Sequence, residues 1–170
     1  KNICQEAVRL KNEGRGEDYI AGYEESNGIT VGSYVFDKDG ICAAMLLCEI
    51  AAELKLQDKN YNDRLEEIYD IYGIMKSRQI RMDTGGERQT EIMDKLRNAD
   101  KFPLKLLSKK DYLGDENMKQ NLLIFDFENC ALAVRPSGTE PLIKFYLQAS
   151  GADFEGCFEK MEEFIKSVIK

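Results

Sequence analysis

Three short apolar segments in the C-terminal half most constrain what this chain can fold into. They read LLIFDF, CALAVR and LIKFYLQA, and only short turn-forming stretches separate them. In the third segment Ile143, Phe145 and Leu147 recur with the period of two that places alternate side chains on one face of a β-strand. Strands joined by such short connections form hairpins, so we predict a mainly antiparallel sheet over residues 122–149.

Two helices are predicted to cover one face of this sheet. Residues 84–87 (TGGE) have the T-x-x-E form of a capping box and precede a helical pattern over residues 88–99. A second helix begins near Asp153 and carries an apolar stripe along its length. The stripe consists of Phe154, Cys157, Phe158, Met161, Phe164, Ile165 and Val168. Helices packed on one face of a sheet make a two-layer α+β domain, which we place at residues 77–170.

The N-terminal half has the pattern of an α/β layer. A first helical pattern ends near Gly14, and extended segments then flank the acidic turn GYEESNG at residues 22–28. Residues 41–54 are apolar on nearly all sides, which suits a helix buried between a sheet and other elements. This succession of strand, loop and buried helix predicts a fragment of a layered α/β domain, which we assign to residues 1–76.

The boundary between the two predicted domains lies in residues 74–83. The helical pattern before it, over residues 61–72, has Asn60 or Asn62 available as its N-cap and ends at Gly73. Beyond this glycine the sequence reads as an extended connection. We expect the second domain to pivot on this connection.

The composition excludes several functional classes. The 170 residues include 24 basic and 31 acidic side chains, and the resulting net charge of -7 argues against a general binder of nucleic acid or membrane surfaces. No apolar run approaches the roughly 18 residues of a membrane span, and histidine is absent. Five cysteines without a C-x-x-C pair favour reduced thiols in the core of a cytoplasmic protein. The first residues resemble neither a signal peptide nor an initiator sequence, so we expect a soluble chain that begins mid-protein.

The loop VRPSGTEP, residues 134–141, has the chemistry of an anion site. The proline after the arginine should direct that arginine out of its strand, and a positive φ at the glycine would turn successive backbone N–H groups inward as a nest. The two hydroxyl side chains and a lysine on the next strand add donors that suit phosphate oxygens. The candidate phosphate-binding residues are therefore Arg135, Ser137, Gly138, Thr139 and Lys144. An ordinary hairpin loop with a solvated arginine explains the same residues equally well.

The acidic turn GYEESNG places Glu24 and Ser26 between two glycines. An ionised carboxylate accepts hydrogen bonds and cannot donate them, so an ordered glutamate beside a serine suits the hydroxyl groups of a sugar. A solvated acidic turn is the alternative. A hard metal ion would need more oxygen ligands than this turn supplies, and the glycine of DKDG, residues 37–40, comes too early for a calcium loop. We therefore expect no metal site in this chain.

These motifs together resemble those of the α-D-phosphohexomutases, the phosphoglucomutase and phosphomannomutase enzymes. GYEESNG, then DKDG with its apolar helix, and finally RPSGTEP with IKFY occur in the order found in the bacterial members. Those proteins have four domains. The resemblance covers essentially the whole chain and places it at the later part of domain 3 and all of domain 4.

The resemblance implies a role for each motif. In the family the first glutamate and the serine of the domain 3 motif bind sugar hydroxyls, which corresponds to Glu24 and Ser26. The arginine, serine, glycine and threonine of the domain 4 loop bind the phosphate that is not being transferred. Lys38 in DKDG resembles a lysine near the reaction centre of some members. The whole enzyme exchanges a phosphoryl group between a phosphoserine and a hexose phosphate, with Mg²⁺ and a hexose 1,6-bisphosphate intermediate.

Two parts of that chemistry are absent from these residues. No S-H-N-P-like segment supplies the phosphorylated serine, and no D-x-D-x-D-R segment supplies metal ligands. We expect the chain alone to be inactive as a mutase and to bind no cofactor, with a hexose phosphate and the missing N-terminal domains as its partners. Two alternatives stay open: a stand-alone, non-catalytic phosphate-binding module, and a subunit that completes the active site of another polypeptide.

Overall fold

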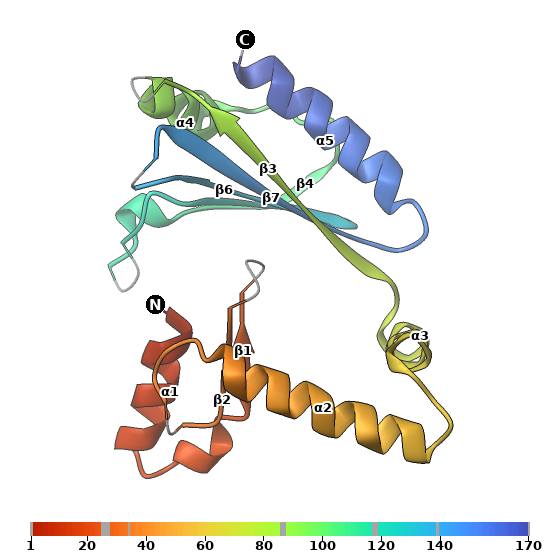
Figure 1. Cartoon of the computed structure of the whole chain (residues 1–170). Helices are drawn as coiled ribbons and strands as arrows, with labels where there is room; N and C mark the ends of the chain where they lie inside the picture. The colour runs from red at the N-terminus through yellow and green to blue at the C-terminus, as the bar shows by residue number, and fades with distance from the viewer. Residues whose placement is uncertain are drawn as a thin grey trace. The chain divides into compact units, whose positions relative to one another are not determined.

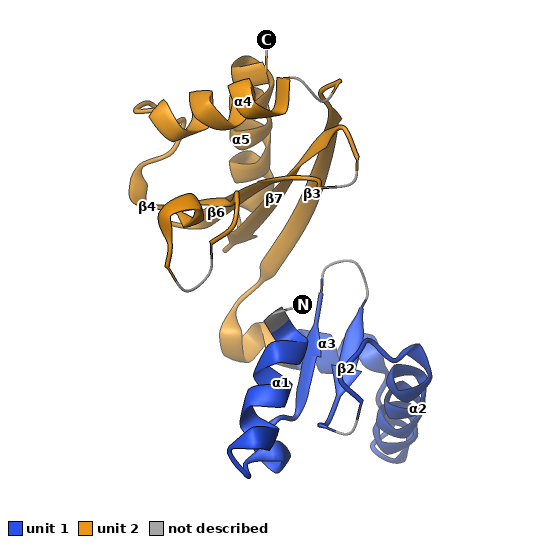
Figure 2. Cartoon of the chain, turned by 90° about the vertical axis from the view of Figure 1, so that its left-hand side faces the viewer, with its two compact units in different colours: residues 1–67 blue, residues 68–170 orange. Residues whose placement is uncertain are grey.

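The chain forms two compact units, Lys1–Glu67 and Ile68–Lys170 (Figures 1 and 2). The computed structural model describes residues 2–24, 28–33, 35–85, 88–116, 119–138 and 140–169. The units divide within a helix, and the division at residues 76 and 77 stays a prediction.

Unit 1 contains short strands between helices. Its elements are α1 (Asn2–Asn12), η1 (Gly16–Asp18), β1 (Ala21–Tyr23), β2 (Ile29–Val31) and α2 (Gly40–Leu56), and α3 (Tyr61–Tyr72) continues into unit 2. β1 and β2 pair antiparallel, with Ala21 opposite Val31. The predicted helix ends are confirmed where local signals are strong: the Asn60 side chain accepts the N–H groups of residues 62 and 63, and Gly73 has a φ of 82°.

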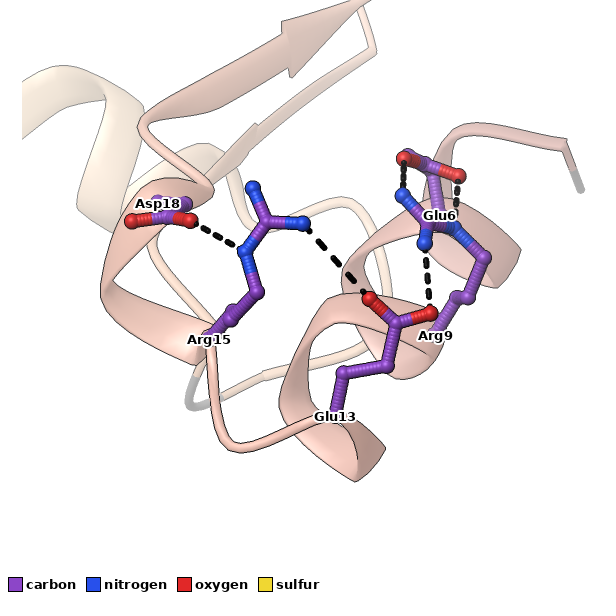
Figure 3. A network of polar contacts seen from close by, with 5 residues as sticks. All are labelled: Glu6, Arg9, Glu13, Arg15 and Asp18. Carbon is purple, nitrogen blue, oxygen red and sulfur yellow. Dashed lines mark hydrogen bonds and ion pairs between the residues drawn. The ribbon is translucent and has the colours of Figure 1, made fainter.

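A small core joins α1 to the segment before β1. Ala7, Leu10 and Tyr19 are buried together, and Ile3 packs against them. On the solvent side of α1, five charged residues form the network of Figure 3. They are Glu6, Arg9, Glu13, Arg15 and Asp18. All of them are exposed, so this network contributes little to stability and is a solvated face.

The expectation that α2 is a buried helix is wrong for this chain. Only Ala43 and Leu54 of α2 are buried, while Ile41 is 77% and Leu56 is 89% exposed. The start of the helix is fixed by Asp39, whose side chain caps it by accepting the N–H groups of Ile41 and Cys42. In the described residues, unit 1 has a two-stranded sheet, which is too small to cover an all-apolar helix.

Unit 2 is the predicted α+β two-layer domain. Its elements after α3 are β3 (Met75–Asp83), α4 (Arg88–Asn98), β4 (Leu106–Asp111), η2 (Tyr112–Gly114), β5 (Leu123–Phe127), β6 (Cys130–Pro136), β7 (Leu142–Ser150) and α5 (Phe154–Ile169). The sheet has the order β3-β7-β6-β5-β4, and all neighbouring strands are antiparallel. Both figures show α4 and α5 on the same side of the sheet, as predicted.

The core of unit 2 lies between the sheet and these two helices. Alternate strand residues such as Val134, Ile143 and Phe145 are fully buried, and they meet Ile92 of α4 and Met161 of α5 in one apolar cluster. Neither α4 nor α5 covers the opposite face of the sheet, to which the intervening residues of the strands point. That second face carries Arg135 and Lys144 together with apolar residues such as Ala133 and Ile124.

Three local expectations need correction. Residues 75–83 are extended but are not a free connection, because β3 pairs along its whole length with β7. Thr84 does not cap α4, because the next residue, Gly85, has a non-helical φ of 66° and the Thr84 hydroxyl donates to the carbonyl of Pro141. Among the cysteines only Cys130 is buried, whereas Cys48 is exposed.

Candidate functional site

The first candidate site is the loop of residues 137–141 between β6 and β7. The two strands stay in register up to the loop, with Arg135 opposite Lys144 and Pro136 opposite Ile143. The Ser137 N–H closes the hairpin by donating to the Leu142 carbonyl at 2.8 Å. Because Arg135 is opposite Lys144, the register brings both predicted cations to one side of the loop. Arg135 is exposed and Lys144 is half-buried.

Thr84 and Gln89, which the sequence analysis did not connect with this loop, bind its far side. The Thr84 N–H and hydroxyl both donate to the Pro141 carbonyl, at 2.9 and 3.1 Å. The Gln89 amide donates to the carbonyls of Glu140 and Leu142, both at 3.1 Å. No sequence signal identified these contacts, because their partners are 51 to 57 residues away.

The predicted nest at Gly138 is not formed. The φ of Gly138 is not positive, so the left-handed turn that a nest requires is absent there. A Cβ at this position would meet no atom within 4 Å, which means that the space beside the glycine is open. The Ser137 N–H is already bonded within the hairpin, so the donors left to Ser137 reduce to its hydroxyl. Thr139 lies outside the described residues.

The second candidate site surrounds Glu24 in unit 1. The Glu24 N–H donates to the Gly28 carbonyl at 2.8 Å, which closes the acidic turn. The Lys38 ammonium donates to the Glu24 carboxylate at 3.0 Å, so the structure joins two residues that the sequence analysis had treated separately. This hydrogen bond, together with the charge of Glu24, raises the pKa of Lys38 above its ordinary value. Ser26 lies outside the described residues.

Neighbouring side chains leave little room beside Gly22 and Gly28. Gly22 lies within β1 and not in a turn as expected, and a Cβ there would come within 2.3 Å of Ile3 and 2.4 Å of the Tyr19 hydroxyl. A Cβ at Gly28 would come within 2.2 Å of the Lys38 side chain. Both glycines therefore let neighbouring side chains approach the backbone closely.

Glu24 and Lys38 line a pocket of about 560 Å³. Gly22, Gly28 and Thr30 form part of its wall, and α1 contributes further residues between positions 3 and 8. The sequence analysis missed α1 as a part of this wall, because its helical pattern carries no binding motif. Asp37 also lines the pocket, so its wall carries two carboxylates and one ammonium group and can both accept and donate hydrogen bonds.

Metal ligands do not gather in the described part of the chain. No three side chains of the Cys, Asp or Glu type are close enough together there to hold an ion. Among the helices in the same residues, none is long and apolar enough to cross a membrane.

Two family descriptions match the chain in succession. Residues 7–72 match "Phosphoglucomutase/phosphomannomutase, alpha/beta/alpha domain III", and residues 79–163 match "Phosphoglucomutase/phosphomannomutase, C-terminal domain". The chain belongs to the phosphoglucomutase/phosphomannomutase family. Glu24 and Lys38 fall within the first match and Arg135 and Lys144 within the second.

Similar proteins in this family are considerably longer. A phosphoglucomutase of Staphylococcus aureus (strain USA300) is 30% identical over 98% of this chain, which covers 33% of that protein. A "Probable phosphomannomutase" of Haemophilus influenzae is 34% identical over 91% of this chain and is also covered to 33%. The chain thus spans about a third of these relatives. A crystal structure of a family protein from Burkholderia thailandensis has the same fold, with a TM-score of 0.54 at 15% identity over 95% of this chain and 30% of that one.

Proposed function

We propose that this chain is the C-terminal part of a phosphohexomutase, which interconverts hexose 1-phosphate and hexose 6-phosphate. In this proposal Glu24 and Ser26 bind sugar hydroxyls. The phosphate that is not being transferred is bound by Arg135, Ser137, Gly138, Thr139 and Lys144. The observation that carries the proposal is the register that sets Arg135 opposite Lys144 beside the loop.

The charge of this cross-strand pair favours an anion. Like charges on directly opposed residues of neighbouring strands destabilise a sheet. A phosphate dianion between Arg135 and Lys144 would offset that repulsion and accept charge-assisted hydrogen bonds from both side chains. The Ser137 hydroxyl lies one residue beyond the end of β6 and is a further donor. Because these groups bind the phosphate without reacting with it, their part is to position the substrate.

The Glu24–Lys38 pair favours a polyhydroxylated ligand. Glu24 as a carboxylate accepts hydrogen bonds from hydroxyl groups, while the ammonium of Lys38 donates them. The ion pair also holds the carboxylate in place at the pocket wall before a ligand arrives, which lowers the entropy cost of binding. We assign Lys38 this positioning role and no role in proton transfer.

The remaining chemistry is proposed for residues outside this chain. In a full-length enzyme Mg²⁺ would neutralise charge on the phosphoryl group, and a hexose 1,6-bisphosphate would be the intermediate. The described residues offer no cluster of side chains that could hold this ion, so its ligands would belong to other parts of the enzyme. We propose that the chain alone turns over no substrate, acts with N-terminal domains of the same protein, and works in the cytoplasm.

Binding experiments on the 170-residue chain test the proposal. We expect the wild type to bind inorganic phosphate and glucose 1-phosphate at millimolar concentrations in NMR titrations, and Arg135→Gln to lose both. Glu24→Gln should weaken binding of glucose 1-phosphate and leave inorganic phosphate unchanged. If Glu24→Gln changes neither ligand while Arg135→Gln loses both, the stand-alone phosphate module is the better description. Wild-type binding by Arg135→Gln would refute both.

A further inference from the structure

A third cationic side chain, Arg81 on β3, lies beside the two cations of the candidate phosphate site. β3 pairs with β7 in a register that sets Arg81 opposite Lys144, and β6 pairs with β7 so that Arg135 is opposite the same lysine. Arg81, Lys144 and Arg135 therefore form one row across three neighbouring strands. We call this row the cation row.

All three side chains belong to the face of the sheet that α4 and α5 leave uncovered. The residues on both sides of Lys144, Ile143 and Phe145, are fully buried in the helix-covered core, and so is Val134, which precedes Arg135. Since successive side chains of a strand point to opposite faces, the cation row lies on the other face. Arg81 is exposed, and its Nε donates to Gln79 Oε1 at 2.7 Å, two residues away along the same face.

The fold leaves the charge of this row uncompensated. Within the described residues none of its three members forms an ion pair. Other arginines of unit 2 show the contrast: Arg78 pairs with two carboxylates of α5, and Arg97 pairs with Asp94 and Asp111. Directly opposed like charges cost stability, so a row of three cations is favourable only when an anion reaches it.

We infer that Arg81 is a further ligand-binding residue of the phosphate site and that the cation row selects a dianionic phosphomonoester over a monoanion. This inference rests on the phosphate site proposed above. Gln79 fixes the guanidinium through its Nε and leaves the two terminal amino groups as donors. A ligand with two negative charges spread over three oxygens can be bonded from several strands at once, which a carboxylate cannot match.

The test compares Arg81→Gln with two other variants of the 170-residue chain. Arg135→Gln tests the phosphate site itself. Lys110→Gln is the matched control, because it removes one positive charge from the same face at β4, opposite Ile124 and away from the cation row. Each protein is titrated with inorganic phosphate at pH 8 and with acetate, and binding is followed by NMR. The Arg81 Nε resonance reports whether the environment of this guanidinium changes when the ligand binds.

We expect Arg81→Gln to weaken phosphate binding by roughly tenfold, as for the loss of one charge-assisted hydrogen bond, while Lys110→Gln binds like the wild type. In phosphate-free buffer of low salt, Arg81→Gln should melt no lower than the wild type, because it relieves repulsion. If Arg135→Gln loses binding but Arg81→Gln keeps it, the inference fails and the phosphate site stands. If Arg135→Gln also binds like the wild type, or the wild type shows no saturable binding, both fail.

Discussion

Thr84 and Pro141 are joined by two hydrogen bonds, from the Thr84 N–H and from its hydroxyl, to a single carbonyl oxygen at 2.9 and 3.1 Å. Thr84 is 7% exposed and directly follows the edge strand β3, whereas Pro141 is the last residue before β7. The candidate phosphate loop is therefore attached to a strand 57 residues earlier in the chain. Its geometry depends on the packing of the sheet as well as on its own sequence.

Replacing Thr84 by valine removes one of these bonds and keeps the shape of the side chain. We expect Thr84→Val to lower the free energy of unfolding by about 1 kcal/mol, because the backbone N–H bond persists and one hydrogen bond is lost. Phosphate binding should weaken as well, and hydrogen exchange at the Ser137 amide should speed up. Thr84→Ser retains the hydroxyl and is the control. Unchanged exchange and binding in Thr84→Val would show that the loop holds its shape without this contact.

The parts of the fold that local signals determine were predicted from the sequence. The period of two in β7 and the long apolar stripe of α5 identified the two layers of unit 2. An element that buries one face repeats its apolar residues with the period of a strand or a helix. β4 was missed because it is an edge strand. All its residues after Leu106 are exposed, so its sequence shows no alternation of apolar and polar residues. The Thr84 contact was mistaken for a capping box, because its true acceptor is far away in the sequence.

Gly22 provides a test of the close approach at the wall of the pocket. Gly22→Ala would place a methyl group within 2.3 Å of Ile3 and 2.4 Å of the Tyr19 hydroxyl. We expect a loss of about 1–3 kcal/mol in the free energy of unfolding, the usual cost of overpacking. Gly40→Ala is the matched control, since a methyl group at this first residue of α2 meets nothing within 4 Å. Urea unfolding followed on unit 1 resonances measures both, and equal stabilities would contradict the packing described.

The candidate site was only partly accessible to sequence analysis. The motifs named candidate residues, but not which of them would meet. The Lys38–Glu24 pair depends on a bend that returns the chain after β2, and the wall formed by α1 depends on the packing of Ile3 and Tyr19. Such contacts arise from the tertiary fold, and no spacing in the sequence encodes them.

The cysteines should differ strongly in reactivity. Burial raises the pKa of the Cys130 thiol to about 11, and a neighbouring Cys157 acts in the same direction. At pH 8 this thiol is protonated, and a protonated thiol is a poor nucleophile. We expect Ellman's reagent to modify the exposed Cys48 first and Cys130 last in the native chain. Cys48→Ser should remove the fastest phase and Cys130→Ser should leave it unchanged. Labelling of Cys130 at the rate of Cys48 would contradict this order.

The Glu24–Lys38 pair predicts a specific dependence of stability on pH. The pKa of Lys38 is raised above its ordinary value in the folded chain, first by the hydrogen bond that Lys38 donates to Glu24 and then by the charge of Glu24. A group with a raised folded pKa stabilises the fold fully below its unfolded pKa, and this contribution disappears as the pH rises through the folded pKa. The difference in stability between the wild type and Glu24→Gln should therefore be constant between pH 7 and about 10 and should then shrink.

In the same variant, an NMR titration of the Lys38 side chain should give a pKa closer to the ordinary value. The matched variant Lys38→Met should lack the change above pH 10, whereas an unshifted Lys38 titration in Glu24→Gln would show that the pair is not formed in solution.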